Sequence, residues 1–193
     1  MKLQGKPRHA VVTGASSGIG QAIVNQLLAD GWRVTGLCRT VGADVISGLS
    51  IVPVDLTDFD RLEAIAQALE PADAFIHAAG FMRTAPLGEL SMDEGAQMWR
   101  VHVDAAALLA DRLEPTMPQG GRIVLVGSRT ANGAPTRSQY AATKAALVGM
   151  ARSWAAELAP RGITVNVIAP GATDTPFLRD PGGGGRAAGD GHG

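Results

Sequence analysis

Short apolar runs rich in valine and isoleucine alternate along this chain with longer stretches of helical pattern. Such alternation is typical of a parallel sheet whose successive strands are joined through helices. The runs IVLV and ITVNVI are apolar almost throughout, as expected of strands covered by helices on both faces. The sequence therefore predicts an α/β fold of three layers, a doubly wound parallel sheet of about six strands between helices.

The pattern also predicts where each element lies. Strands are expected at residues 9–13, 33–38, 51–54, 74–77, 122–126 and 163–168. Helices are expected at residues 17–30, 58–69, 93–114 and 137–158. Gly31 is placed to end the first helix and Asp58 to cap the second.

Composition changes near the C-terminus. The last fifteen residues hold seven glycines and none of Val, Ile, Leu, Phe, Met, Trp or Tyr. Such a segment cannot bury enough apolar surface to offset the entropy lost on ordering. We expect one domain over residues 1–178 and a disordered, Gly-rich tail over residues 179–193.

Charge and cysteine content exclude several classes of protein. A net charge of −1 gives no reason to expect nucleic acid or an anionic membrane as partner. Cys38 is the only cysteine, which excludes an intramolecular disulfide and a cysteine-based metal cluster, and no metal site is expected. No apolar segment resembles a signal peptide or a membrane span, so we expect a cytoplasmic protein.

A glycine-rich loop separates the first strand from the first helix and reads Thr13-Gly-Ala-Ser-Ser-Gly-Ile-Gly20. Glycines let the backbone turn tightly and approach a pyrophosphate, to which the helix N-terminus offers free N–H groups. A tight strand–helix turn without a ligand would use glycines too, but the strand–loop–helix context favours a dinucleotide. The candidate contacts are Gly14, Ser16, Ser17, Gly18, Ile19 and Gly20.

Further motifs follow in order and at compatible spacings. They are His77-Ala78-Ala79-Gly80, Ser128, Tyr140-Ala-Ala-Thr-Lys144, and Pro170-Gly171 followed by Thr173 and Thr175. With the G-xxx-G-x-G spacing of the first loop, this pattern over residues 9–178 resembles the short-chain dehydrogenase/reductase family. The family usually has Asn-Asn-Ala-Gly where this chain has His77 to Gly80, and it usually continues beyond the Pro-Gly turn with another helix and a seventh strand.

The resemblance implies a Rossmann-like fold, here with the usual seventh strand missing, and an NAD(P)-dependent oxidoreductase acting on CH–OH or C=O groups. It implies a small-molecule carbonyl or alcohol substrate and a homodimer or homotetramer. Ser128, Tyr140 and Lys144 take the catalytic positions. Besides the glycine loop, the positions that would contact the cofactor are Asp55, Leu56, Ala78, Ala79, Gly80, Tyr140, Lys144, Pro170, Gly171, Thr173 and Thr175.

The chemistry of these side chains agrees with the resemblance. Tyr140 and Lys144 are four residues apart, so they project from one face of the expected helix. We expect the nearby ammonium to lower the pKa of Tyr140 from about 10, so that the phenol can exchange a proton with a substrate oxygen. Ser128 would donate a hydrogen bond to the same oxygen. The resemblance adds that Lys144 holds the nicotinamide ribose.

His102 departs from the family pattern, because the stretch Val101-His102-Val103 stands where an asparagine usually helps to relay protons to the lysine. A histidine can donate and accept hydrogen bonds and could serve in such a relay. A histidine satisfied within the helix packing is the alternative.

The end of the second strand bears on cofactor choice. NAD-preferring folds commonly place an acidic residue there, whereas this chain has Cys38 and Arg39. Arg39 can hold a 2′-phosphate with its planar fork, which favours NADP(H) over NAD(H), although NAD(H) stays possible. The alternative is that Arg39 is a solvated loop charge and the protein does not select. Asp55 matches a position beside the adenine, or it is a capping aspartate in its loop.

Two functions remain open. The intact Ser128, Tyr140 and Lys144 favour a working NADP(H)-dependent oxidoreductase. The early end favours a non-catalytic dinucleotide-binding remnant, or a partner subunit, without a closed substrate pocket. The substrate itself is not identified, although several side chains that follow strand ends are candidates to face it, namely Phe81, Met82, Arg83, Arg129 and Phe177.

Overall fold

The computed structural model describes residues 6–40 and 45–174, so the expected tail and its boundary at residue 178 lie outside the described residues. The strands are β1 (His9–Thr13), β2 (Arg33–Cys38), β3 (Leu49–Pro53), β4 (Ala74–His77), β5 (Arg122–Val126) and β6 (Thr164–Ile168). The helices are α1 (Gly18–Ala29), α2 (Phe59–Ala68), α3 (Met92–Trp99), α4 (Ala105–Leu113) and α5 (Ser138–Leu158).

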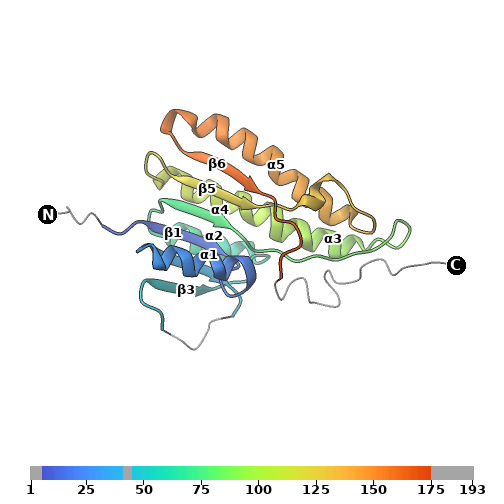
Figure 1. Ribbon diagram of the computed structural model, residues 1–193, viewed down its shortest axis with the longest axis horizontal. Coiled ribbons are helices and arrows are strands. Elements are labelled where there is room, and N and C mark those ends of the chain that lie inside the picture. Colours follow the sequence, from blue (N-terminus) through green and yellow to red (C-terminus); the bar gives the residue numbers. More distant parts are fainter. Residues whose placement is uncertain (1–5, 41–44, 175–193) are drawn as a thin grey trace.

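All six strands are parallel and form one sheet in the order β3-β2-β1-β4-β5-β6 (Figure 1). The chain therefore winds outward from β1 in one direction, returns, and winds outward from β4 in the other. Between β1 and β4 the connections diverge, which is where open α/β sheets bind ligands at the carboxyl ends of their strands. The predicted Rossmann-like, doubly wound parallel sheet is confirmed.

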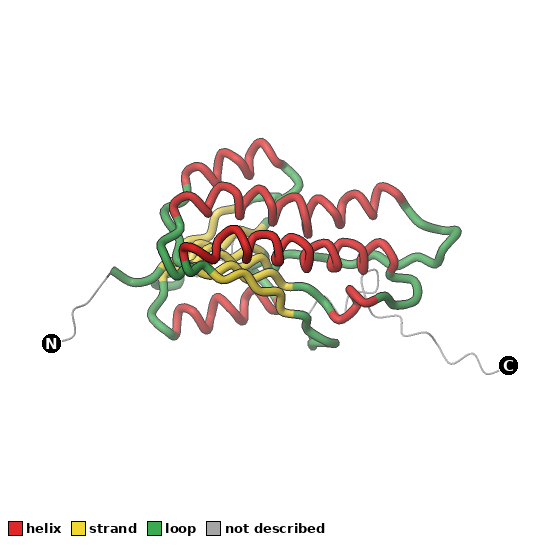
Figure 2. Tube along the Cα trace, turned by 90° about the horizontal axis from the view of Figure 1, so that it is seen from above, coloured by secondary structure: helices red, strands yellow, loops and turns green. Residues whose placement is uncertain are grey.

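Alternate residues of the strands face two separate cores. Val11 and Phe75 point to the larger core, which they share with α2, α4 and α5. Val12 and Ile76 point the other way, to a smaller core closed by α1. Figure 2 shows the sheet between these two helix layers, as the period of two along a strand requires when both faces are covered.

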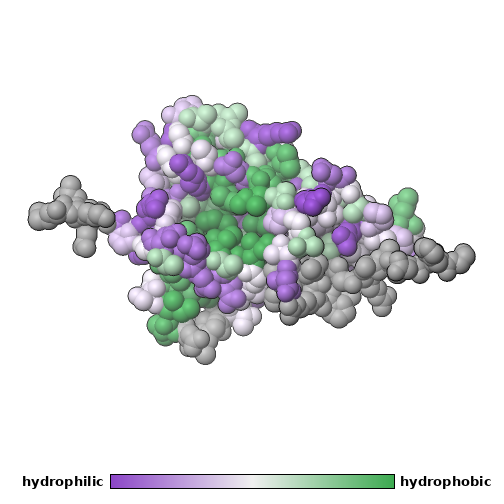
Figure 3. Space-filling view, viewed as in Figure 1, coloured by the Kyte–Doolittle hydropathy of each residue, from purple (hydrophilic) through white to green (hydrophobic). Residues whose placement is uncertain are grey.

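The α1 side of the sheet is only partly covered. Figure 3 shows a hydrophobic area between α1 and α5, over the strands. Within residues 6–40 and 45–174 no helix covers β5 and β6 on this side, so Val124 stays half-buried and Ile168 is exposed. In the same part of the chain, no helix is both long and apolar enough to cross a bilayer.

Most expected boundaries agree with the structure to within one or two residues. Gly31 follows α1 with a φ of 78°, in the left-handed region that ends helices. Asp58 caps α2 by accepting a hydrogen bond from the N–H of Arg61. Strand β3 begins at Leu49 rather than at residue 51, because its pairing with β2 extends to Val34.

The helix expected at residues 93–114 is not continuous. It is divided into α3 and α4 by a π-helical turn over Arg100–Asp104, in which the N–H of Ala105 bonds to the carbonyl of Arg100 five residues back. The wider turn leaves the carbonyl of Val101 to accept a hydrogen bond from His77 Nε2 at 3.1 Å. Single π-helical turns within α-helices often mark functional sites, and this one contains His102.

Candidate active site

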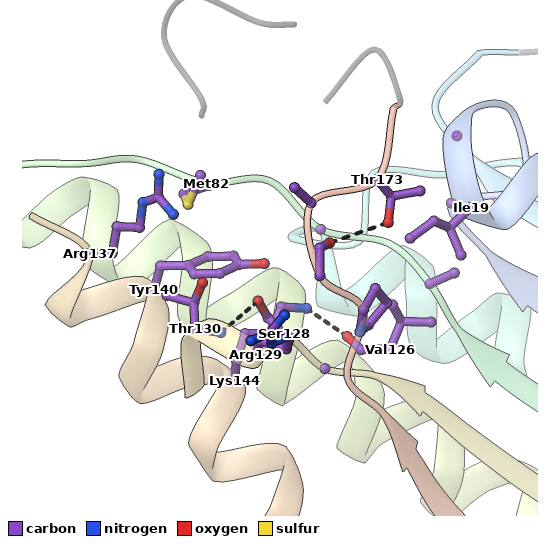
Figure 4. A pocket seen from close by; sticks show the side chains of 18 of the residues that line it. Ile19, Met82, Val126, Ser128, Arg129, Thr130, Arg137, Tyr140, Lys144 and Thr173 are labelled. Carbon is purple, nitrogen blue, oxygen red and sulfur yellow. Dashed lines mark hydrogen bonds between the residues drawn. The ribbon is translucent and has the colours of Figure 1, made fainter. Parts of the chain in front are cut away.

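A cleft of about 610 Å³ lies at the carboxyl ends of the strands, beside the divergence of β1 and β4. The glycine loop forms one end, and the segments after β4, β5 and β6 form the rest (Figure 4). The predicted site residues that line it are Gly14, Ser17, Gly18, Ile19, Gly20, Ala78, Ala79, Gly80, Ser128, Tyr140, Lys144, Pro170, Gly171 and Thr173. Residues from the middle and the end of the described chain thus meet a loop that lies near its beginning.

The geometry of the glycine loop suits a phosphate. Gly14 and Gly18 have φ values of 68° and 53°, which L side chains rarely adopt. A Cβ on Gly14 would lie 2.8 Å from the Cα of Ala79, so only glycine lets the two loops approach this closely. Ser17 begins α1 without a side-chain cap and no acidic residue follows in the first turn. The free N–H groups and the positive end of the helix therefore fit the pyrophosphate of a dinucleotide.

Thr13 joins the ends of β1 and β4. Its hydroxyl accepts hydrogen bonds from the N–H groups of Ala78 and Ala79, both at 3.1 Å, and contacts His77 Nδ1 at 3.0 Å. Since His77 Nε2 donates to Val101, Nδ1 is the acceptor and the Thr13 hydroxyl donates to it. Burial, and next the charge of Lys144, lower the pKa of His77 to about 3, so this imidazole is neutral.

Ser128, Tyr140 and Lys144 converge at the middle of the cleft. Ser128 follows β5, and its Oγ accepts a hydrogen bond from the N–H of Thr130 at 3.1 Å. Tyr140 and Lys144 lie on the inner face of α5, both more than nine-tenths buried. Lys144 Nζ donates to the carbonyl of Val126 at 2.8 Å and lies 5.7 Å from the centre of the Tyr140 ring. A hydrogen bond also joins the side chains of Ser128 and Tyr140.

Burial controls the acidity of both groups on α5. It raises the pKa of Tyr140 above 10.0, against opposing effects of the hydrogen bond from Ser128 and the positive charge of Arg137. This direction is opposite to the one expected from the sequence, because desolvation of the phenolate outweighs every nearby positive charge. Burial also lowers the pKa of Lys144, to about 8.

His102 is fully buried beside this centre and is absent from the cleft wall. Its Nε2 accepts the N–H of Phe81 at 3.1 Å, so Nδ1 carries the proton and donates to Thr143 Oγ1 at 2.8 Å. Thr143 in turn donates to the carbonyl of Tyr140. Desolvation lowers the pKa of His102 well below 6.5. Both ring nitrogens are thus satisfied within the protein, which favours the packing role over the proton relay.

The structure places the other predicted cofactor residues around the cleft rather than in its wall. Arg39 and Asp55 are exposed after β2 and β3 and interact electrostatically. Asp55 accepts hydrogen bonds from the N–H and hydroxyl of Thr57, which lower its pKa, and Leu56 is buried in the core. Ser16 lines a neighbouring hollow. Thr175 lies outside the described residues.

Some side chains in the cleft wall were missed or only suggested by the sequence. Met82 and Arg129, two candidates to face the substrate, line the cleft, whereas Phe81 and Arg83 are absent from its wall, and Phe177 lies outside the described residues. Arg137 lines the cleft and was not predicted. Its position three residues before Tyr140 was the available signal, because residues three apart share a helix face.

A model of the short chain dehydrogenase family matches residues 8–182, nearly the whole described chain and its entire cleft. The chain belongs to this family. As a short-chain dehydrogenase it is an oxidoreductase that acts between CH–OH and C=O groups, and it is shorter than its relatives.

Known relatives agree with this assignment. The 3-oxoacyl-[acyl-carrier-protein] reductase MabA of Mycobacterium tuberculosis is 35% identical over 179 residues, which cover 89% of this chain and 72% of that protein. The crystal structure of BdcA in complex with NADPH is 30% identical with a TM-score of 0.81, covering 90% of this chain and 75% of BdcA. A dehydrogenase from Beutenbergia cavernae with bound NADP is 33% identical with a TM-score of 0.80, covering 89% and 74%.

The buried lysine predicts how the stability of this dehydrogenase depends on pH. The folded pKa of Lys144, about 8, lies below the 10.5 of an exposed lysine, so the unfolded chain binds more protons between these values. The free energy of unfolding should therefore rise with pH in this window, by about 2 kcal/mol between pH 7.5 and 9.5. Urea unfolding at a series of pH values measures it.

Lys144→Met is the control, because it removes the titrating group and should remove this rise. The raised pKa of Tyr140 acts only above pH 10.0 and does not disturb the comparison. A rise of equal size in both proteins would show that Lys144 is not its source.

Proposed function

We propose that this dehydrogenase is an NADP(H)-dependent oxidoreductase that transfers hydride between nicotinamide and a carbonyl or alcohol substrate, with Tyr140 as general acid and base. One observation carries the proposal: a single cleft is lined both by the glycine loop at the N-terminus of α1 and by Ser128, Tyr140 and Lys144. A dinucleotide whose pyrophosphate lay at α1 would extend toward these three side chains, where a substrate oxygen has both a proton donor and a hydrogen-bond donor.

The residues have distinct tasks in this proposal. The bound nicotinamide supplies or accepts the hydride. In reduction the carbonyl carbon gains that hydride while its oxygen takes the proton of Tyr140, and the tyrosine regains a proton from solvent; oxidation runs in reverse. Ser128 donates to the oxygen as negative charge develops on it. Lys144, fixed by Val126, would hold the ribose hydroxyls and stabilise the phenolate.

Cofactor preference follows from the end of β2. Arg39 stands there, exposed, and no carboxylate occupies the position of Cys38, whose thiol is buried and donates to the carbonyl of Thr40. The hydrogen bond from Gly14 to the carbonyl of Leu37 holds this strand end beside the glycine loop. Arg39 can therefore reach a 2′-phosphate. Two similar structures hold NADPH and NADP, which supports the preference.

Three substitutions test the mechanism. Tyr140→Phe should lower kcat by about a hundredfold or more while NADPH binding is kept, because only the proton donor is lost. Ser128→Ala should lower kcat by about a hundredfold through loss of one donor to the oxyanion. Lys144→Met should damage both turnover and binding. NADPH oxidation over a panel of carbonyl compounds and an NADPH titration measure the two effects.

The alternative function gives a different pattern in the same assays. A non-catalytic dinucleotide-binding protein would bind NADPH and oxidise none of the panel. A Tyr140→Phe protein that kept near-normal turnover would refute the role of Tyr140.

The preference for NADP(H) has its own test. The unmodified protein should bind NADPH more tightly than NADH, and Arg39→Ala should remove most of the difference, a factor of about ten to a hundred for a charged hydrogen bond. Arg61→Ala is the matched control, since it removes another arginine nearby whose guanidinium is already bonded to the carbonyl of Pro53. Equal affinities in the unmodified protein would contradict the prediction.

We further propose that the protein acts in the cytoplasm. We also propose that it forms at least a dimer through the outer faces of α4 and α5, where Leu108, Met150 and Trp154 are half-buried. Gly149 offers a clean test, because a Cβ there would meet nothing within 4 Å. Gly149→Arg should turn a dimer into a monomer without disturbing the core, and Gly149→Ala should not. Light scattering at micromolar concentration reads the mass, and a monomeric unmodified protein would count against this assembly.

A further inference from the structure

Three cationic or proton-bearing side chains form a stripe along α5. Arg137 is the N-cap residue of α5, three residues before Tyr140, and Lys144 follows Tyr140 by four on the same helix face. All three line the cleft. Figure 4 shows Arg137 on one side of the Tyr140 ring, with Ile19 and Thr173 on the other. Arg137 therefore lies beyond the tyrosine as seen from the glycine loop, away from the end where a pyrophosphate fits.

The ionised side chains among the described residues of the cleft wall are all positive. Its ionisable members besides Tyr140 are Arg129, Arg137 and Lys144, and no described aspartate or glutamate lines it. Lys144 is bonded to Val126, and Arg129 lies against Gly171, 3.7 Å from the position of a Cβ there. Within residues 6–40 and 45–174 the guanidinium of Arg137 has no hydrogen-bond or ion-pair partner in the protein.

The backbone around Arg137 adds to this field. Arg137 stands at the start of α5, a helix of 21 residues with no side-chain cap and no acidic residue in its first turn. The guanidinium thus belongs to a residue at the positive end of a helix dipole. Both features favour an anion at this end of the cleft.

The residue before Arg137 is held in an unusual conformation. Thr136 has a φ of 63°, the only described residue other than glycine in the left-handed region, and β-branched residues adopt it at a cost. Its carbonyl accepts the N–H of Ala85 at 2.9 Å, which ties the segment after β4 to the start of α5. This hydrogen bond holds the backbone next to Arg137, from which its side chain extends into the cleft. Strained residues are typical of functional sites.

We infer that Arg137 determines substrate specificity by binding an anionic group, a carboxylate or a phosphate, on the substrate whose carbonyl oxygen meets Tyr140 and Ser128. The inference rests on the proposed function, which names only a carbonyl or alcohol. The substrate is then an oxo acid, a hydroxy acid or a phosphorylated analogue. Its charged end lies beside Arg137, and its reacting carbon lies between Tyr140 and the nicotinamide end of the cleft.

Matched pairs of small carbonyl compounds test the inference. The probes are pyruvate, acetoacetate and levulinate, each beside its methyl ester, and dihydroxyacetone phosphate beside dihydroxyacetone. They differ in charge and in the distance between the carbonyl and the anion, and the phosphate pair separates the two kinds of anion. Isothermal titration into the protein saturated with NADP+, which cannot reduce a carbonyl, measures binding alone, and the same titration without NADP+ shows whether binding needs the cofactor.

Arg137→Gln removes the charge, and Arg137→Lys keeps it. The matched control is Arg83→Gln, because Arg83 is a cation of the neighbouring segment that is absent from the cleft wall and already paired with Glu94 at 3.5 Å. At least one charged probe should bind the unmodified protein more tightly than its uncharged partner. Arg137→Gln should weaken that probe about tenfold or more and leave the uncharged partner unchanged. Arg137→Lys should restore part of the affinity, and Arg83→Gln should have no effect.

Steady-state reduction with NADPH separates this inference from the proposed function. The inference is supported if Arg137→Gln has a higher KM for the charged substrate than the unmodified protein has, with a smaller effect on kcat. Uncharged partners that bind and react as well as the charged probes, or an equal loss in Arg83→Gln, would overturn the role of Arg137 and leave the oxidoreductase standing. Charged probes that bind through Arg137 without turnover of any carbonyl would support the anion site and refute the oxidoreductase.

Discussion

The hydroxyl of Thr13 holds together the two halves of the sheet where the cleft opens. It accepts the N–H groups of Ala78 and Ala79 and donates to His77, so the ends of β1 and β4 are joined by three hydrogen bonds from one side chain. The approach is possible because Gly14 has no Cβ to meet Ala79. Every later part of the cleft is placed relative to this junction, since β5 pairs with β4 and β6 with β5.

The junction is connected to the side chains at the middle of the cleft by neutral hydrogen bonds. His77 donates to Val101 in the π-helical turn, and the next residue, His102, donates to Thr143, which donates to the backbone of Tyr140. Because burial keeps both imidazoles uncharged, these bonds do not depend on pH in the neutral range. A histidine thus stands where the resemblance led us to expect an asparagine, and both of its nitrogens are bonded within the protein.

The electrostatics of the cleft differ from those of the whole chain. A net charge of −1 gave no reason to expect nucleic acid or an anionic membrane as partner, yet the described cleft wall carries only positive ionised groups. A local cluster decides binding because screening by salt and water limits exposed charges to short range. Burial sets the acidity of Tyr140 and Lys144: it raises the pKa of the phenol and lowers the pKa of the ammonium, and each shift favours the neutral form of its side chain.

The sequence by itself determined the order and type of the elements, since short apolar runs, helical patterns and glycine turns are local. It also determined the motifs that contain Ser128, Tyr140 and Lys144. Three features needed the tertiary structure. The division of the expected helix at His102 depends on a hydrogen bond from His77, a residue of another strand. The pKa of Tyr140 depends on burial under segments distant in sequence. The spacing of Arg137 from Tyr140 was a local signal, but its place in the cleft also depends on a strained backbone tied to Ala85, a contact between segments distant in sequence.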